Sequence, residues 1–310
     1  MTLRASIDLG TNTCLLLIAK WNFEKNDVDS LVGDYSTIVR LGQGVDQNRK
    51  LNPDAMLRTL ACLKNYSDKI RKNNLRPEDT ICVATSQARD ASNSNVFFIQ
   101  VEKETGFHFR TLHGDQEARL SFWGSLLPEM APENHAVIDI GGGSTEFMSE
   151  QCGYSLNLGS VRFTERYLKS DPVTDEEFWK CQEQIDHELV TIQGWRETHG
   201  KTSHLVANAG TATTLAAWHL GLNEFDSQSI DKTTLTRGDI HRMVEELKWR
   251  TIQERKQLIG IEPQRADVLL AGAMILWRAM ELLRFSDCRI SSRGLRYGVL
   301  KNSSNKNNLF

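Results

Sequence analysis

Short apolar runs alternate along the chain with longer stretches in which apolar residues recur every three or four positions. The short runs, at residues 5–8, 14–19, 81–84, 136–140 and 205–207, are typical of buried strands. Strands that alternate with helices predict an α/β fold. Helices are predicted where the longer period holds, from Pro53 to Ile70 behind the N-cap candidate Asn52, and over 117–127, 176–191, 211–220, 237–256 and 265–284.

One pattern occurs twice, with 131 residues between its two copies. Ile7–Thr13 and Ile138–Ser144 each read as an apolar residue, Asp, an apolar residue, Gly, two small or polar residues and a hydroxyl residue. A repeat at about the length of a domain predicts two halves of related fold. Each half would present an aspartate and a glycine turn, and we expect the halves to face each other across a cleft.

Composition and charge limit the classes of partner. The 310 residues suggest two domains, and 40% hydrophobic with 25% charged residues is the balance of an ordinary globular protein. The 37 basic and 40 acidic residues give a net charge of −3, which argues against extensive binding to nucleic acid or to an anionic membrane. No apolar run approaches the roughly 20 residues of a membrane helix. We therefore expect a cytoplasmic protein with no membrane partner and no nucleic-acid partner.

The two Asp-x-Gly turns predict a phosphate site with a divalent cation. Glycine lets a ligand approach the backbone, and consecutive backbone N–H groups in a turn bind anions. Aspartate repels phosphate, so Asp8 and Asp139 are best explained as ligands of Mg²⁺ or another divalent cation, held directly or through water. The alternative is that both segments are plain hairpin turns, and their recurrence in matching halves favours the phosphate site. The predicted phosphate-binding residues are Gly10, Thr11, Asn12 and Thr13 in the first turn and Gly141, Gly142, Gly143, Ser144 and Thr145 in the second.

Three side chains and one loop fit the same chemistry. Glu146 follows the second glycine turn and Glu117 opens a predicted helix, and a glutamate beside phosphate can orient and deprotonate an attacking water. Arg89 follows a buried strand, and its planar guanidinium suits phosphate. Taken alone, Glu117 also fits a solvated helix position and Arg89 a surface salt bridge. Gly210 and Thr211 are candidates for a nucleotide or phosphate contact at a helix start, with an ordinary N-cap by Thr211 as the alternative.

The C-terminal stretch after Cys288 is basic. It carries five basic residues and no acidic one, which fits either a strip that binds a polyanion or a solvated helix face. The five are Arg289, Arg293, Arg296, Lys301 and Lys306.

These residues together resemble the exopolyphosphatase and guanosine pentaphosphate phosphohydrolase family, Ppx/GppA, of the actin-like ATPase superfamily. The resemblance extends along nearly the whole chain. The most specific match is Asp-Ile-Gly-Gly-Gly-Ser-Thr-Glu at 139–146, and the segments 8–13, 40–44, 85–93, 116–119, 158–162 and 265–272 are also similar.

The resemblance implies a fold and a set of roles. The fold is α/β, with two actin-like (ribonuclease H-like) domains and an interdomain cleft. Residues 1–117 form domain I, residues 118–294 form domain II, and a C-terminal segment of about 295–310 packs back on domain I. The implied roles are metal or water coordination for Asp139, water activation for Glu146, catalysis for Glu117 and phosphate contact for Arg89. A homodimer is expected from the family alone.

Two functions from different classes follow. The first is a phosphohydrolase that releases the terminal phosphate of inorganic polyphosphate or of guanosine pentaphosphate (pppGpp) by metal-assisted attack of water, with Glu146 and Glu117 as catalytic carboxylates. The alternative is a non-hydrolytic sensor that binds polyphosphate or a guanosine alarmone. Two glutamates favour catalysis, because a binder gains nothing from acids beside phosphate. The sequence leaves open which substrate is preferred, and it departs from the family's glycine-rich stretch at 208–211.

Overall fold

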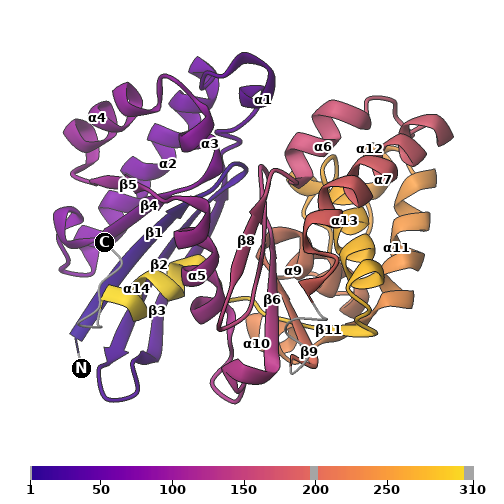
Figure 1. The fold of residues 1–310 in the computed structure, drawn as a ribbon. Coiled ribbons are helices and arrows are strands. Elements are labelled where there is room, and N and C mark those ends of the chain that lie inside the picture. Colours follow the sequence, from indigo (N-terminus) through magenta and orange to yellow (C-terminus); the bar gives the residue numbers. More distant parts are fainter. Residues whose placement is uncertain (1, 196–201, 304–310) are drawn as a thin grey trace. The chain divides into compact units, whose positions relative to one another are not determined.

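The structure is a computed structural model that describes residues 2–195 and 202–303 (Figure 1). The chain divides into two compact units. Unit 1 comprises the residues up to Gly124 together with the segment from Leu295, and unit 2 comprises Ser125–Gly294.

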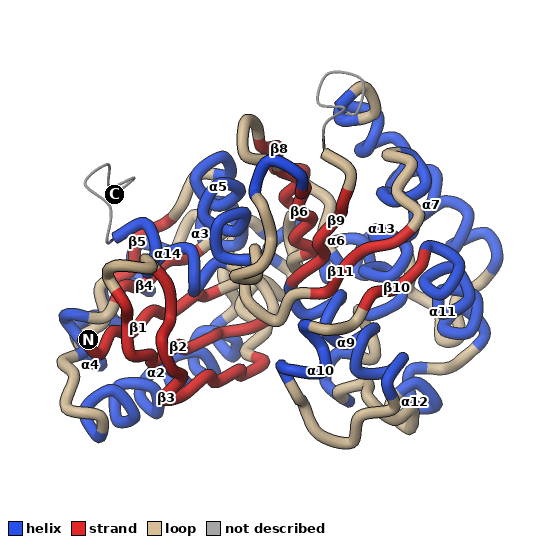
Figure 2. The backbone as a smooth tube through the Cα atoms, turned by 90° about the horizontal axis from the view of Figure 1, so that it is seen from below, coloured by secondary structure: helices blue, strands red, loops and turns tan. Residues whose placement is uncertain are grey.

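Unit 1 is built on a five-stranded sheet, whose strands are red in Figure 2. Strands β1, β2 and β3 form an antiparallel meander, and β4 and β5 extend the sheet from β1 in parallel, so the order is β3-β2-β1-β4-β5. The strands are β1 (Thr2–Leu9), β2 (Thr13–Asn22), β3 (Asp27–Ile38), β4 (Ile81–Ala84) and β5 (Phe109–Thr111), and the helices are α1 (Val45–Asn48), α2 (Pro53–Lys72), α3 (Ser86–Asp90), α4 (Ser94–Thr105), α5 (Gly114–Ser125) and α14 (Leu295–Ser303).

Both faces of this sheet are covered, because β2 is apolar on both sides. Leu16 and Ile18 belong to a core with α2, whereas Leu17 and Trp21 pack against Tyr297 of α14. Successive side chains of a strand point to opposite faces. Helix α14, from the C-terminal part of the chain, therefore lies on the face opposite α2.

An ion pair fastens α14 to the meander. The Arg296 guanidinium donates from Nε and Nη2 to the two carboxylate oxygens of Asp34, at 2.9 and 2.8 Å. Burial alone lowers the pKa of Arg296, but the charge and hydrogen bonds of Asp34 outweigh it and the pKa is raised. Arg296 is 6% exposed, so its charge depends on this partner.

Unit 2 repeats the same sheet. Strands β6, β7 and β8 form an antiparallel meander, β9 and β11 extend it from β6 in parallel, and β10 adds an antiparallel edge. The order β8-β7-β6-β9-β11 matches β3-β2-β1-β4-β5 in every strand direction, which confirms two halves of related fold. The strands are β6 (His135–Ile140), β7 (Thr145–Met148), β8 (Gly153–Leu156), β9 (His204–Asn208), β10 (Thr234–Thr236) and β11 (Asp287–Ile290), and the helices are α6 (Ser160–Tyr167), α7 (Asp175–Leu189), α9 (Ala209–Leu220), α10 (Ser227–Asp231), α11 (Arg237–Trp249), α12 (Ile252–Arg255) and α13 (Leu269–Leu282).

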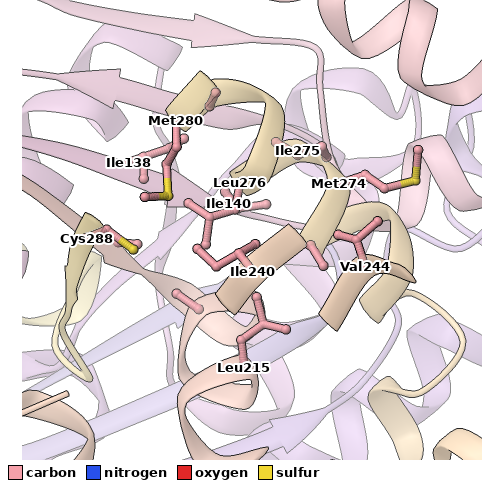
Figure 3. Packing of buried hydrophobic residues seen from close by; sticks show 14 of the residues in the cluster. Ile138, Ile140, Leu215, Ile240, Val244, Met274, Ile275, Leu276, Met280 and Cys288 are labelled. Carbon is pink, nitrogen blue, oxygen red and sulfur yellow. The ribbon is translucent and has the colours of Figure 1, made fainter. Parts of the chain in front are cut away.

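The core of unit 2 lies between its sheet and its helices. Ile138 and Ile140 of β6 meet Leu215 of α9, Ile240 of α11 and Leu276 of α13 in one buried cluster (Figure 3). Helix α13 is apolar nearly all round and is buried along most of its length, as a helix enclosed by other elements must be.

Two predicted helices differ from the structure. The helix predicted over 237–256 stops at Trp249, because Arg250 is extended and Thr251 starts a new helix with a capping box to Glu254. The helix predicted over 265–284 starts only at Leu269, after one of the short 3₁₀ turns. These turns occupy Pro77–Asp79, Pro132–Asn134, Val190–Ile192 and Pro263–Arg265. None of the described helices has the length and apolar character needed to cross a membrane.

Candidate active site

Both predicted phosphate turns are tight β-hairpins. In unit 1 the Gly10 amide donates to the Thr13 carbonyl at 2.9 Å, and in unit 2 the Gly141 amide donates to the Ser144 carbonyl at 3.0 Å. The hairpin interpretation is therefore correct for the backbone. What the turns can bind depends on where their other peptide groups point.

In unit 2 the start of α6 holds the carbonyl groups of the glycine turn. The Gly141 carbonyl accepts from the Ser160 amide at 3.0 Å, and the Gly142 carbonyl accepts from the next two amides of α6 at 2.9 and 3.1 Å. The Gly143 carbonyl accepts from Arg162 Nε at 2.7 Å. The N–H that follows a carbonyl in a trans peptide points the opposite way, so the amides of this turn point away from α6. The amides of Gly142 and Gly143 donate to no group among the described residues, and consecutive backbone N–H groups of this kind can bind an anion.

Gly159, immediately before α6, permits this close approach. A Cβ atom there would lie 2.5 Å from the carbonyl carbons of both Gly142 and Gly143, and closer still to the Gly142 oxygen. All three are backbone atoms, which cannot rotate aside. Only glycine therefore lets the start of α6 reach the turn.

A different segment holds the first turn in the same way. The Thr11 carbonyl accepts from the Gly42 amide at 2.8 Å, and the Asn12 carbonyl accepts from the amides of Val39 and Arg40, both at 2.9 Å. Within the described part of the chain, the amides of Thr11 and Asn12 have no acceptor. A Cβ atom on Gly42 would collide with the Thr11 methyl group. In both hairpins, the carbonyl groups of the turn thus accept hydrogen bonds from backbone amides of a neighbouring segment.

A row of polar side chains crosses four strands of unit 2 beside the glycine turn. The register places Ser155 of β8 opposite Glu146 of β7, Glu146 opposite Asp139 of β6, and Asp139 beside Asn208 of β9. Residues paired across strands share one face of the sheet. Ser155 Oγ donates to Glu146 Oε1 at 2.7 Å, and Asn208 Nδ2 donates to Asp139 Oδ2 at 3.1 Å. Glu146 is only 1% exposed, so the predicted base is buried next to the predicted metal ligand.

In the equivalent row of unit 1, the two positions that flank the aspartate are apolar. Asp8 lies opposite Leu15 of β2 and beside Val83 of β4. Leu15 and Val83 therefore occupy the positions that Glu146 and Asn208 hold in unit 2. The two units share the backbone arrangement but differ in side chains, because a glutamate lies beside the aspartate in unit 2 and a leucine lies there in unit 1.

Arg89 and Glu117 form an ion pair within unit 1. Arg89 Nη1 donates to Glu117 Oε2 at 2.7 Å and to the Leu112 carbonyl at 2.8 Å. Their side chains are 22% and 9% exposed, so neither the surface salt bridge nor the solvated helix position describes them. No described group accepts from Arg89 Nε or Nη2, and these N–H groups suit a phosphate oxygen.

Two of the predicted phosphate-binding hydroxyls are engaged by the protein itself. Thr11 Oγ1 lies 2.9 Å from Ser86 Oγ and 3.3 Å from Gln87 Oε1. Thr145 Oγ1 donates to the Leu158 carbonyl at 2.5 Å. Both side chains fasten their hairpins to a neighbouring segment, so phosphate contact by these residues stays a prediction that rests on the turn's backbone.

The guanidinium of Arg265 lies against the start of α9. A Cβ atom on Gly210 would collide with the Arg265 guanidinium, which also donates to Glu262 at 2.9 Å. The N-cap of α9 is Asn208, so the N-cap role for Thr211 is wrong. A ligand contact at Gly210 and Thr211 stays a prediction.

The oxygen atoms around Asp139 fit a divalent cation. Asn208 Oδ1 is buried and accepts a hydrogen bond from no described group. A carboxylate beside an orphaned amide oxygen is a donor pair that Mg²⁺ takes, with water supplying the remaining ligands. In unit 1 the two positions beside Asp8 are apolar and supply no such oxygen. The described residues contain no cluster of three or more His, Cys, Asp or Glu side chains suited to a metal ion.

Three of the five basic residues near the C-terminus are engaged by groups of their own unit. Arg296 is paired with Asp34 inside unit 1, and Lys301 donates to a backbone carbonyl of α5 at 3.0 Å. Arg289 belongs to unit 2 and donates to the carbonyl at the end of α10 at 2.5 Å. Arg296 is therefore buried and is no part of an exposed strip, whereas a polyanion contact by the other basic residues stays a prediction. Lys306 lies outside the described residues.

Sequence reasoning gave no role to Ser155, Gly159 or Arg162. A signal for Ser155 was present, because the register of a short hairpin after Glu146 would have placed it opposite that glutamate. Gly159 and Arg162 carried no such signal, since their contacts with the turn join segments that only the folded unit brings together.

Comparison with known proteins decides the family. The model of the Ppx/GppA phosphatase family matches residues 23–307. The chain belongs to this family. The resemblance predicted from the motifs is thereby confirmed.

Two curated relatives and one solved structure illustrate the similarity. The chain is 34% identical over 286 residues to a bifunctional 3-dehydroquinate synthase/phosphatase of Fusobacterium nucleatum, covering 88% of this chain but 42% of that protein, so it spans less than half of this relative. It is 33% identical over 309 residues to exopolyphosphatase 2 of Mycobacterium tuberculosis, covering 92% of both. The crystal structure of an exopolyphosphatase-like protein matches with a TM-score of 0.88 and 27% identity over 98% of this chain and 99% of that one. The prediction of an α/β fold with two actin-like domains is confirmed.

Proposed function

We propose that this Ppx/GppA protein is a phosphohydrolase that releases the terminal phosphate of inorganic polyphosphate, with Mg²⁺ or another divalent cation as cofactor. The observation that carries the proposal is the unit 2 hairpin, where a buried glutamate, an aspartate and free backbone amides lie together. The name of the M. tuberculosis relative supports polyphosphate as the first substrate to test, and pppGpp is the second.

Charge neutralisation is the larger task in phosphoryl transfer. The free amides of Gly142 and Gly143 would bind phosphate oxygens without adding a mobile side chain. A cation held by Asp139, with Asn208 Oδ1 as a further oxygen donor, would offset the negative charge of the phosphate when bound. The free N–H groups of Arg89 would add a planar contact to phosphate.

Water must lose a proton as it attacks phosphorus. Glu146 would accept this proton, and its burial beside the glycine turn, with one oxygen bound by Ser155, supports that role. The general base accepts the proton and leaves the attacking oxygen more nucleophilic. Glu117 assists through Arg89, which it holds by the ion pair at 2.7 Å.

Replacement of Glu146 by Gln tests the proposal. The substitution keeps the shape of the side chain but removes the base, and we expect kcat for phosphate release to fall by about 10²–10⁴-fold, the usual contribution of a general base. Phosphate release is measured with Mg²⁺ on long-chain polyphosphate and on pppGpp at equal terminal-phosphate concentration. Glu150→Gln is the matched control, because Glu150 lies in the exposed turn that follows β7. A folded Glu146→Gln enzyme with the turnover of the unsubstituted protein would remove Glu146 from this role.

The same assay separates the substrates and the two functional classes. Release from polyphosphate alone identifies an exopolyphosphatase, whereas release from pppGpp places the protein in alarmone metabolism. Chelation of the cation should abolish release, and added Mg²⁺ should restore it. Binding of either compound without release would instead support the non-hydrolytic sensor.

A further inference from the structure

We infer that Arg162 is a positioning residue for phosphate binding, whose guanidinium fixes the peptide between Gly143 and Ser144 and places a positive charge behind the glycine turn. This role rests on the proposed phosphate site at the turn and does not depend on which group activates water. Arg162 acts through the peptide, because its contact lies on the carbonyl side of the turn.

Arg162 holds two successive peptide groups of the turn. It lies in the first turn of α6 and is 6% exposed. Its Nε donates to the Gly143 carbonyl at 2.7 Å, and its own backbone amide donates to the Gly142 carbonyl at 3.1 Å. A hydrogen bond from a charged donor is about twice as strong as one between neutral groups. The side chain therefore supplies a strong contact to the second of these carbonyls.

The stability of α6 does not explain a cation at this position. The N-terminus of a helix carries the positive end of the helix dipole, so a basic residue in the first turn is unfavourable. The first turn of α6 contains no acidic residue that would offset it. Burial of a charged side chain adds a further cost. The free energy that retains Arg162 must therefore come from outside the helix, and its hydrogen bond to the glycine turn is one such contribution.

The bond to Gly143 acts on the amide of Ser144. Both groups belong to one trans peptide, so the Ser144 N–H points away from Arg162. In the described part of the chain no group accepts from this N–H, although Ser144 is only 3% exposed. Amides of buried residues are nearly always paired, so this one suits a bound anion. A charged donor on the carbonyl side polarises the peptide and makes its N–H a stronger donor.

The related carbonyl in unit 1 is held by neutral donors. Asn12 corresponds to Gly143 in the repeated pattern, and its carbonyl accepts from the backbone amides of Val39 and Arg40, both at 2.9 Å. Backbone amides fix the direction of a peptide but carry no net charge. The charged donor thus occurs in unit 2, where the turn lies beside Glu146.

An NMR signal of Ser144 reports the proposed contact directly. Labelling of glycine carbonyls with ¹³C and of serine nitrogens with ¹⁵N selects the Gly-Ser pairs, and the amides of Ser125, Ser144 and Ser160 are the three that result. The signal of Ser144 is identified by its loss in Ser144→Ala. A hydrogen bond to the preceding carbonyl withdraws electrons from the peptide nitrogen. Loss of the guanidinium should therefore move the ¹⁵N signal of Ser144 upfield and leave that of Ser125 in place.

The test compares two neutral variants, Arg162→Met and Arg162→Gln, with Arg162→Lys, which keeps the charge. Inorganic phosphate is titrated with Mg²⁺ present while the Ser144 signal is followed, so the dissociation constant does not depend on turnover. We expect each neutral variant to bind phosphate about tenfold more weakly, the contribution of one hydrogen bond to a charged group. Arg162→Lys should recover most of the affinity. KM for polyphosphate should rise with the dissociation constant, while kcat falls less.

Arg278→Met is the matched control for the loss of a buried cation. Arg278 lies in α13 of the same unit, its side chain is 15% exposed, and it donates to Asp186 of α7 at 2.6 Å. Its replacement should lower the melting temperature. The phosphate affinity and the Ser144 signal should stay unchanged, because this ion pair joins two helices and makes no contact with the turn.

Two outcomes would overturn the role of Arg162. Unchanged phosphate affinity and an unchanged Ser144 signal in the neutral variants would show that the guanidinium does not position the turn. A lower melting temperature and a lower kcat, with KM and phosphate affinity unchanged, would assign Arg162 a structural role and also refute positioning.

Failure of the proposed function is a separate result. If Glu146→Gln keeps full turnover, the role of Glu146 in water activation fails, and the phosphate titration still decides the role of Arg162. If phosphate leaves the Ser144 signal of the unsubstituted protein unmoved, the turn is not the phosphate site, and the role of Arg162 fails together with that site.

Discussion

Gly159 is the residue at which a single added methyl group should do the most damage to the site. It contributes no group to binding, yet it lies against the backbone of the glycine turn. A Cβ atom at this position would approach the carbonyl carbons of Gly142 and Gly143 to 2.5 Å. Its backbone is extended, with φ −139° and ψ 153°, which alanine adopts without strain. What opposes alanine here is therefore the steric clash of its Cβ atom with the turn.

The size of the effect follows from this distance. Ordinary contacts of a Cβ atom begin at about 3.4 Å, so the turn and the start of α6 must separate by about 1 Å to accommodate the methyl group. Overpacking of this kind costs about 1–3 kcal/mol of stability. A displacement of about 1 Å in a positioning element can cost about 10²-fold in rate. We therefore expect Gly159→Ala to stay folded, with a lower melting temperature and a kcat reduced about a hundredfold.

The assay combines phosphate release with thermal unfolding for three alanine variants. Gly42→Ala, the equivalent change in unit 1, meets the methyl group of the Thr11 side chain instead of the backbone of the turn, so its loss of rate should be smaller. Gly238→Ala, in the first turn of α11, finds only an ordinary contact at 3.7 Å and should keep full activity. Full activity in Gly159→Ala would refute the argument that the start of α6 fixes the direction of the turn's amides.

Two further predictions concern unit 1. Arg89→Lys keeps the charge but loses the planar guanidinium, so kcat/KM for phosphate release should fall about tenfold or more. The control is Arg71→Lys on the exposed face of α2, which should leave kcat/KM unchanged. Equal kinetics for the two variants would exclude a phosphate contact by Arg89. Asp34→Ala leaves the Arg296 guanidinium buried without its bidentate partner and should lower the free energy of unfolding by about 3 kcal/mol in a denaturant titration. Asp29→Ala, exposed on the same strand, is the control, and a loss below about 1 kcal/mol in Asp34→Ala would show that the pair contributes little.

Local patterns were sufficient for most of the fold. Asn52 caps α2 and Pro53 is its first residue, as predicted, because both signals act within one helical turn. The break after Trp249 was missed because the apolar period continues across it, while the capping box at Thr251 competes with the helix. Arg296 was placed in the basic strip for a related reason, since a run of like charges does not reveal that Arg296 is itself buried and paired with Asp34, more than two hundred residues away.

The sequence by itself determined the repeat, the turn residues and the family. Each of these depends on residues close together in the chain, and glycine, aspartate and hydroxyl residues carry their chemistry wherever a tight turn is formed. The backbone of the two hairpins could therefore be anticipated from Ile7–Thr13 and Ile138–Ser144 alone.

Only the tertiary structure decided what surrounds these turns. The carbonyls of Gly141–Gly143 are directed by amides of α6, and Asp139 acquires an asparagine from β9 on one side and a buried glutamate on the other. The same structure joins Arg89 to Glu117, which the sequence treated as separate residues. These contacts depend on strand register and on close packing between distant segments. A local pattern cannot specify them, because the free energy that fixes them comes from the burial of the whole unit.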